Sequence, residues 1–244
     1  MAIRRSAAWW TSSPETAVSA AREPIVTIRL SNRRLGTLGL AAVAVILAGM
    51  TITAIPYSGY AGEAYSPFNH FISELGEIAA SHLAWVFNLG IVLGGMGLGT
   101  FLLVLSRRLD GRYGAALRAV SVVAGVAGTA VGIFPMDYPT VHLTVSIAFF
   151  LSGWITAAVF SLWQLRRRSP GYPRWLIGPA ALNIVVSWIF IVVFAGYHPA
   201  NPDAKIIDRP AIWSVPALEW ASLLTLLLWL ACLAFVTRRL PESD

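Results

Sequence analysis

Charged residues are scarce in this chain of 244 residues. Asp, Glu, Lys and Arg together make up only 12% of it, whereas hydrophobic residues make up 57%. A soluble domain carries about twice that share of charged residues. This scarcity argues against an ordinary soluble protein, and the mean hydropathy of +0.67 favours a protein of the membrane.

Cysteine and lysine are also nearly absent. The single cysteine, Cys232, excludes an internal disulfide and a metal cluster built on cysteines. Lys205 is the single lysine, so the formal net charge of +6 comes from arginine. The arginines form short clusters beside apolar runs, a pattern typical of membrane topology. We therefore expect no nucleic-acid partner.

Six apolar runs are long enough to cross a bilayer as helices, which takes about 20 residues each. None of them has an acidic residue near its middle. Lipid forbids unpaired backbone groups, and the alternating pattern of a membrane β-barrel is missing. The sequence therefore predicts an all-α polytopic membrane protein with six transmembrane helices. The predicted spans cover residues 35–57, 79–106, 114–134, 142–165, 174–196 and 216–237.

The basic residues predict how the chain is oriented in the membrane. Given these six spans, 16 of the 18 lysines and arginines fall on one side, and only Lys205 and Arg209 fall on the other. Because positively charged loops stay in the cytoplasm, we predict a cell-membrane protein with both termini cytoplasmic. Residues 1–34 form an Arg-rich N-terminal tail that we expect to be disordered, and residues 238–244 form a C-terminal tail.

Glycines recur at intervals of four residues in the second and third spans. Gly95 and Gly99 lie in the second span, and Gly128 and Gly132 lie in the third. Small residues at this spacing let helix backbones approach closely. We expect the two spans to pack as antiparallel neighbours, and the same faces could also hold a second copy or another membrane protein.

A polar segment, "NHFISELGE" at residues 69–77, precedes the second span on the predicted outer side. Read as a helical turn, it places Asn69 with Ser73 and His70 with Glu74 on one face. Such a helix would lie at the membrane interface or in the mouth of the bundle. The alternative is a solvated loop in which these pairs are incidental.

Two further polar pieces belong to the same side. Asp137 and His142 bracket a tight hairpin between the third and fourth spans, and we expect them to point into one volume. The alternative is that the acid caps a turn and the histidine is interfacial. Glu219 falls in the expected first turn of the sixth span, where an acid also favours the helix dipole. Its role is therefore either structural or functional.

The segments "NHFISELG" and "GIFPMD", followed by His142 and set in a six-span layout, resemble the DUF998 family of prokaryotic membrane proteins. The resemblance covers residues 35–237. A more distant similarity links the chain to the eukaryotic Frag1/DRAM/Sfk1 group, which is associated with lipid handling. The DUF998 family has no known function, so the resemblance implies a fold and motif positions. The motif residues it implies are Ser73, Glu74, Gly76, Pro135, Asp137 and His142.

Three classes of function fit these observations, and whether the protein is an enzyme stays open. The first is a lipid-handling protein with an extracytoplasmic polar site. The others are a membrane scaffold or assembly subunit and a small-solute transporter. Transport has less support, because no charged residue lies at the midplane of a predicted span. The candidate residues for catalysis or for binding a lipid headgroup are Ser73, Glu74, Asp137, His142 and Glu219.

No cofactor is predicted, although zinc is conceivable because imidazole and carboxylate groups bind it. Membrane hydrolases of the ceramidase type carry a pair of histidines in a late helix. The fifth and sixth spans contain no histidine, so that scheme lacks ligands. The remaining candidate ligands are His142, Asp137, Glu74 and His70.

Overall fold

The computed structural model describes residues 30–169, 171–197 and 209–242. Most of the predicted N-terminal tail, and Lys205, lie outside the described residues. The described residues form six long α-helices and two short 3-10 helices, with no strand among them. All six long helices are apolar enough to cross a membrane, which confirms the predicted all-α class with six spans.

The long helices lie within a few residues of the predicted spans. The largest difference is at the second span, where residues 79–83 form turns ahead of the helix. The long helices are α1 (Asn32–Ala54), α2 (Ala84–Ser106), α3 (Gly111–Ile133), α4 (Pro139–Arg167), α5 (Ile177–Ala195) and α6 (Ser214–Arg239). The short 3-10 helices are η1 (Ile72–Gly76) and η2 (Arg174–Leu176).

Local sequence signals set several helix ends. The Ser31 side chain accepts a hydrogen bond from the backbone of Arg34, which caps the start of α1. Pro139 opens α4, at a position where its missing N–H costs nothing. Arg168 ends α4 in the left-handed conformation, with φ of 50°. The chain then turns through η2 into α5.

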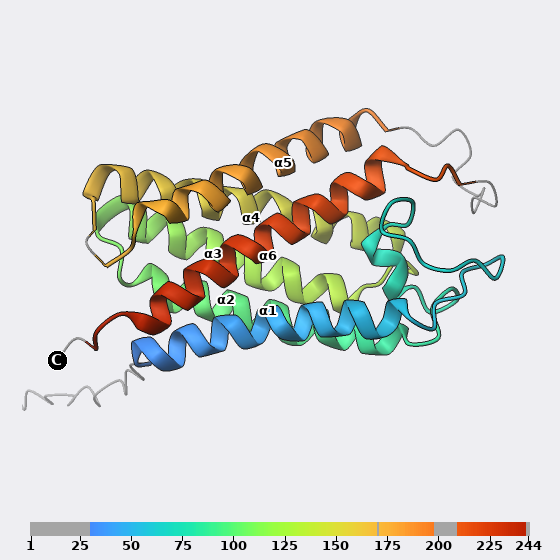
Figure 1. The fold of residues 1–244 in the computed structure, drawn as a ribbon, viewed down its shortest axis with the longest axis horizontal. Helices are drawn as coiled ribbons and strands as arrows, with labels where there is room; N and C mark the ends of the chain where they lie inside the picture. Colours follow the sequence, from blue (N-terminus) through green and yellow to red (C-terminus); the bar gives the residue numbers. More distant parts are fainter. Residues whose placement is uncertain (1–29, 170, 198–208, 243–244) are drawn as a thin grey trace, which may run out of the picture.

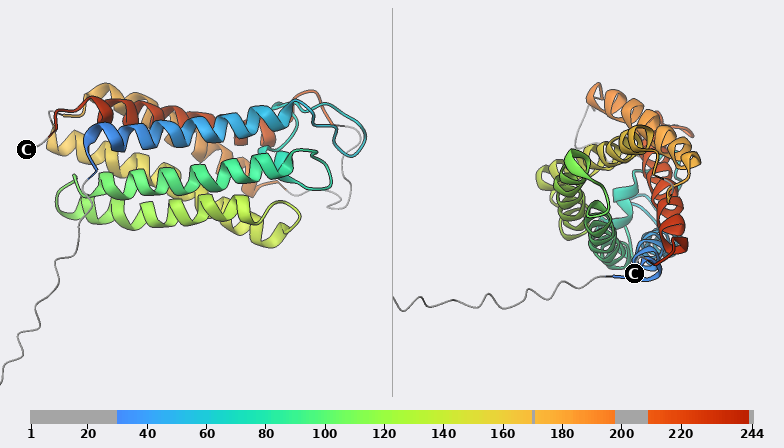
Figure 2. Two further views of the ribbon diagram at one scale, coloured as in Figure 1. Left: turned by 90° about the horizontal axis from the view of Figure 1, so that it is seen from below. Right: turned by 90° about the vertical axis from the view of Figure 1, so that its left-hand side faces the viewer.

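The six helices run along one another and close into a ring, because α1 packs against α6 as well as α2 (Figure 1). Seen end-on, the ring surrounds the short segment that contains η1 (Figure 2). We call this end of the bundle the η1 end. The opposite end, the arginine end, carries the start of α1, the end of α6 and the α2–α3 turn (Figure 1).

The glycine faces of α2 and α3 meet, as their spacing predicts. A Cβ added to Gly99 would lie 2.6 Å from Gly125 Cα, and one added to Gly95 would lie 2.6 Å from Thr129 N. The two backbones are therefore in direct contact, which compensates for the missing hydrophobic drive in lipid. These glycines pack inside the chain, and a homo-oligomer stays a prediction.

Polar side chains join α5 to α6 within the membrane-spanning region. Asn183 Nδ2 donates to the Ser222 carbonyl at 3.2 Å, and the Ser187 and Ser222 hydroxyl oxygens are 2.7 Å apart. Hydrogen bonds between helices are one of the main attractions available in lipid. The two helices are therefore held together along one face, next to a core of buried apolar residues.

Candidate functional site

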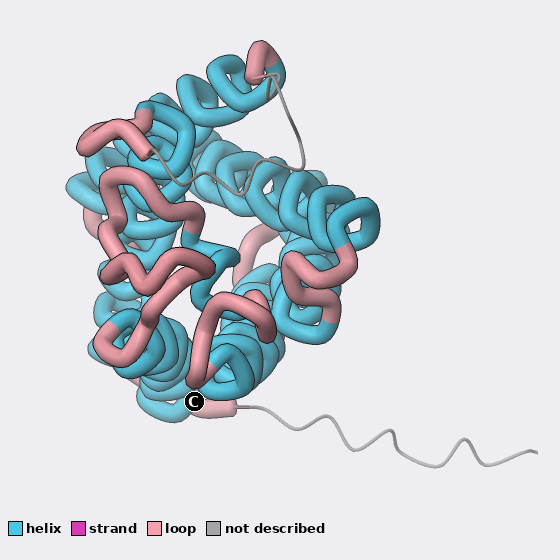
Figure 3. The backbone as a smooth tube through the Cα atoms, turned by 90° about the vertical axis from the view of Figure 1, so that its right-hand side faces the viewer, coloured by secondary structure: helices cyan, strands magenta, loops and turns pink. Residues whose placement is uncertain are grey.

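The chain before α2 folds into the mouth of the bundle, where η1 lies inside the ring of helices (Figure 3). We call residues 69–77 the η1 segment. The 3-10 helix η1 begins at Ile72, and Asn69 and His70 precede it in a turn. The predicted α-helical face shared by His70 and Glu74 is therefore wrong. The Glu74 carboxylate folds back to accept a hydrogen bond from Phe71 N at 2.8 Å, which fixes the tighter turn.

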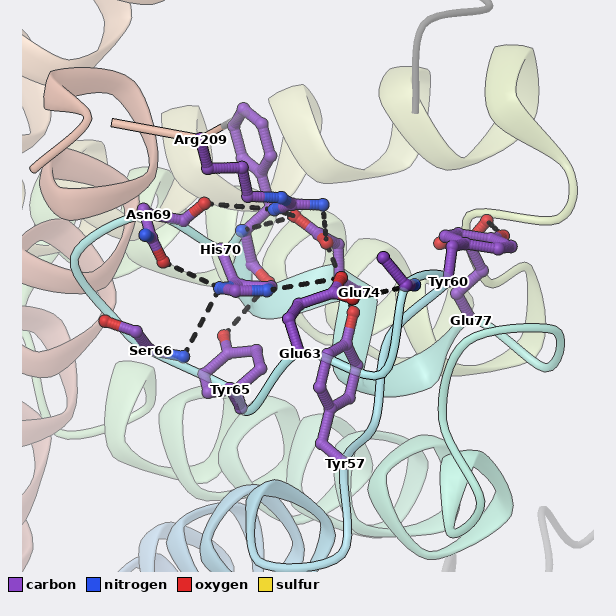
Figure 4. A network of polar contacts seen from close by, with 12 residues as sticks. Tyr57, Tyr60, Glu63, Tyr65, Ser66, Asn69, His70, Glu74, Glu77 and Arg209 are labelled. Atoms are coloured by element: carbon purple, nitrogen blue, oxygen red, sulfur yellow. Dashed lines mark hydrogen bonds and ion pairs between the residues drawn. The ribbon is translucent and has the colours of Figure 1, made fainter. Parts of the chain in front are cut away.

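A buried ion pair anchors η1 to the chain that leads into α6. Arg209 Nη1 donates to Glu74 Oε1 at 2.9 Å, and Nη2 donates to Oε2 at 2.8 Å (Figure 4). The two side chains are only 11% and 5% exposed. The Tyr57 hydroxyl also donates to Glu74 Oε2, at 3.3 Å. Such a bidentate pair with extra hydrogen bonds is the geometry that offsets the cost of burying two charges.

Burial raises the pKa of the Tyr57 phenol well above its usual value, and the nearby Glu74 carboxylate raises it further. The phenol therefore stays protonated and remains a donor to the carboxylate. Sequence reasoning did not assign a role to Arg209. Its signal was present, because Arg209 is one of only two basic residues on the acid-rich side of the predicted topology.

His70 lies beside this pair in an aromatic cluster. Its ring centre is 5.4 Å from that of Tyr57 and 5.1 Å from that of Tyr65. Nδ1 is 2.8 Å from Asn69 Oδ1. Nε2 is buried without a hydrogen-bond partner among the described residues. Burial lowers the pKa of the imidazole, although the Glu74 carboxylate opposes the shift.

Glu219 reaches η1 from the side of α6. Its Oε2 accepts a hydrogen bond from Ile72 N at 2.8 Å, and the residue is 8% exposed. Because α6 begins at Ser214, Glu219 lies in the second turn, and the expected placement in the first turn at the helix dipole is wrong. The acid is instead aimed across the bundle at the backbone of η1.

Two cavities meet at Glu219. The larger, which we call the side cavity, has a volume of about 620 Å³ and lies between α4 and α5 at the η1 end. The smaller, the inner cavity, has a volume of about 70 Å³ and runs into the centre of the ring. Ser73, Phe150 and Glu219 line both, so these residues form the boundary between them.

Three of the predicted site residues line the side cavity, namely Ser73, His142 and Glu219. His142 Nδ1 is 2.8 Å from the Phe134 carbonyl oxygen, and its Nε2 is 3.3 Å from the hydroxyl of Ser146. Ser73 lines both cavities, and its hydroxyl has no hydrogen-bond partner among the described residues.

The other two predicted site residues lie elsewhere. The Glu74 carboxylate is held by Arg209. Asp137 is exposed, and its Oδ2 accepts a hydrogen bond from Ile78 N at 3.1 Å. Asp137 and His142 both flank the α3–α4 turn, yet they bond to different partners, and only His142 lines the side cavity. The α3–α4 hairpin therefore contributes His142, and not Asp137, to the lining of the side cavity.

The candidate zinc ligands His70, Glu74, Asp137 and His142 have the separate partners just described. Within residues 30–169, 171–197 and 209–242, no three His, Cys, Asp or Glu side chains come together in a group that could hold a metal ion. Zinc binding therefore stays a prediction without a donor set in the described part of the chain.

Six apolar helices around an inner cavity define a polytopic α-helical membrane protein. A family model described as "Protein of unknown function (DUF998)" matches residues 40–236, so the chain belongs to the DUF998 family. Comparison with curated proteins and with solved structures gave no match. The relationship to the Frag1/DRAM/Sfk1 group stays a prediction.

Proposed function

We propose that the protein is a lipid-handling protein that holds an amphiphilic molecule in the side cavity. The observation that carries the proposal is the make-up of this cavity. Its wall is almost entirely apolar, and the polar groups of Ser73, His142, Ser146 and Glu219 interrupt it. An apolar space with a few convergent polar groups is the usual form of a small-molecule site.

The size of the side cavity supports the same proposal. Ligand sites for small molecules measure about 300–1,000 Å³, and the side cavity has about 620 Å³. The inner cavity, with about 70 Å³, is too narrow for a whole lipid. We therefore place the body of the ligand between α4 and α5.

The position of the side cavity supports entry from the hydrocarbon core of the membrane. Leu143 and Ile147 line it and are 45% and 43% exposed on α4. A membrane-spanning helix presents such exposed apolar residues to lipid tails. A molecule dissolved in the bilayer would reach the cavity sideways, without crossing the η1 segment.

The η1 segment would cover the polar end of the ligand. Phe71 and Ser73 contribute to the wall of the side cavity. The Arg209–Glu74 ion pair holds this segment in the mouth of the bundle. This arrangement supports binding of a lipid head beneath a fixed cover.

The orientation we propose follows the charges. The arginine end carries the clusters that flank the helices, including Arg107, Arg108, Arg166 and Arg167. Positively charged flanks face the cytoplasm. We place the protein in the cell membrane with both termini cytoplasmic, so that the η1 end and the side cavity belong to the outer leaflet.

The test uses photo-crosslinking in nanodiscs of zwitterionic lipid. Single-chain C16 lipids with a diazirine in the chain are added, and labelled peptides are mapped by mass spectrometry. We expect labelling of the α4 and α5 residues that line the side cavity. Ile147→Trp would fill the cavity and suppress the labelling.

Ile189→Trp is the matched control, because Ile189 is 45% exposed on α5 and lies outside the cavity lining. It should leave the labelling unchanged. Labelling that is uniform over all lipid-facing helices, or that Ile147→Trp does not reduce, would overturn the proposed function.

The two alternative functions have less support. A transporter needs a path through the bundle. Transport has less support because Glu219 is the one charged side chain among the described residues that line the two cavities. A scaffold would use outer surfaces and would not need a side cavity. Both stay predictions, and flux into proteoliposomes or a stable copurifying protein would favour them.

A further inference from the structure

Glu219 is a buried acid, and only one of its two carboxylate oxygens has a hydrogen-bond partner among the described residues. Oε2 accepts the hydrogen bond from Ile72 N. Oε1 has no hydrogen-bond partner among the described residues, although Glu219 is more than nine-tenths buried. The residue lines both cavities, so Oε1 is available to a molecule at the junction. A ligand that places a hydrogen-bond donor at the junction would give Oε1 the partner that the described residues do not supply.

Glu219 is the one charged side chain among the described residues that line the two cavities. No lysine or arginine among the described residues lines either cavity. The nearby cation, Arg209, donates to Glu74 through Nη1 and Nη2. Within the described part of the chain, the acid therefore has no counter-ion in the wall of its own cavity. A phosphate or carboxylate head would bring a second acidic group to Glu219, whereas an ammonium head would supply the missing cation.

A second polar group sits beside the acid at the same boundary. Ser73 lines both cavities, and its hydroxyl has no hydrogen-bond partner among the described residues. A hydroxyl both donates and accepts, so it suits the second polar atom of an amino-alcohol head. His142 contacts the Phe134 carbonyl through Nδ1 and the Ser146 hydroxyl through Nε2, so these two side chains offer fewer free groups to a ligand.

From these observations we infer that the side cavity takes a single-chain lipid with a primary amine head, and that Glu219 is the residue that binds the ammonium group. This inference rests on the proposed function and names its ligand class. The narrow inner cavity accommodates no second chain. Glu219 Oε1 selects for the charge of the lipid headgroup. The opening between α4 and α5 selects only for an apolar tail.

The test compares three diazirine lipids with the same C16 chain: a primary amine, an alcohol and a carboxylic acid. The signal is the labelling of the side cavity that Ile147→Trp abolishes, titrated with unlabelled C16 amine. A charge-assisted hydrogen bond is stronger than a neutral one, so we expect the amine to bind at least about tenfold more tightly than the alcohol. The acid should bind most weakly.

Glu219→Gln should reduce amine affinity to the level of the alcohol and leave alcohol binding intact, which also shows that the variant is folded. Glu77→Gln removes an acid from the same end of the bundle but outside both cavities, and it should change neither affinity. If Glu219→Gln does not fold, the ranking of the three heads on the native protein decides.

The two proposals fail in different ways. Equal binding of amine and alcohol, or amine binding that survives Glu219→Gln, would overturn the amine inference and leave a lipid site. Tight binding of the acid would overturn it as well. Absence of cavity labelling by all three lipids would overturn the proposed function itself.

Discussion

Arg209 and Glu74 lie 135 residues apart in the chain and form a bidentate ion pair inside the mouth of the bundle. The pair joins the segment before α2 to the segment before α6. Neither of these two segments contains a long helix. The cover over the side cavity therefore depends on a contact between two loops, which makes this pair the most informative one to break.

Removing one member of the pair should destabilise the protein strongly. Arg209→Gln leaves the Glu74 carboxylate buried with its charge uncompensated, a change that costs about 3 kcal/mol or more. The free energy of unfolding, measured by titration with a denaturing detergent, should fall by that amount. Arg107→Gln, an exposed arginine at the other end, is the control and should change it by less than about 0.5 kcal/mol.

The double variant Arg209→Leu with Glu74→Leu removes both charges at once. It should be more stable than either single leucine variant, because no unpaired charge is left behind. Additive losses in this cycle would mean that the two side chains do not interact as the structure has them.

Acidification should destabilise the η1 segment through His70. Burial lowers the pKa of His70 below its ordinary value of 6.5, so the unfolded chain takes up the proton first as the pH falls. The stability from the neutral imidazole is full above about pH 6.5 and is lost as the pH drops through the folded-state pKa. The thermal midpoint of unfolding should therefore decrease as the pH is lowered from 7.5 to 5.5.

The groups that face His70 are Glu63, Glu74, Arg209, Tyr57 and Tyr65. His70→Phe should flatten the pH profile, whereas the exposed His82→Asn should leave it unchanged. A thermal midpoint that rises on acidification would show that the Glu63 carboxylate, 3.8 Å from His70 Nε2, dominates over burial.

The helices could be predicted because lipid leaves the backbone few choices. A run of about 20 apolar residues must be helical there, and arginine clusters mark the turns. The spacing of Gly95 and Gly99 predicts the α2–α3 contact for a similar reason, since only small residues permit it. These signals are local, and one sequence contains all of them.

The site was less predictable because it depends on contacts that are distant in sequence. Nothing in a single chain pairs Glu74 with Arg209, so the sequence pattern predicts a helical face that Glu74 shares with His70. Its actual hydrogen bond to Phe71 N produces a 3-10 helix instead. The role of Glu219 was obscured by an error of two residues in the start of α6, which made a dipole explanation sufficient.

The α2–α3 contact should tolerate no side chain at Gly99. A Cβ there would lie 2.6 Å from Gly125 Cα, and backbone cannot yield as a flexible side chain can. Gly99→Ala should lower the free energy of unfolding by about 1–3 kcal/mol. Gly178→Ala is the control, because a Cβ at Gly178 in α5 meets no atom within 4 Å. Equal effects of the two substitutions would contradict the close helix contact.

The last prediction concerns how η1 rests on α2. A Cβ added to Gly76 would collide with Asn88 Oδ1 and lie 2.8 Å from Phe87 Cδ1. The same asparagine donates to the Gly76 carbonyl at 2.9 Å. Gly76→Ala should therefore cost about 1–3 kcal/mol of unfolding free energy through overpacking, and Asn88→Ala about 1 kcal/mol through the lost hydrogen bond.

The double variant Gly76→Ala with Asn88→Ala separates these effects. Removing the asparagine side chain makes room for the new methyl group, so the double variant should lose less stability than the sum of the two single losses. The contact with Phe87 remains and keeps some of the cost. Strict additivity would mean that η1 does not sit on α2 at Gly76, and the position of Ser73 at the boundary of the two cavities would then need revision.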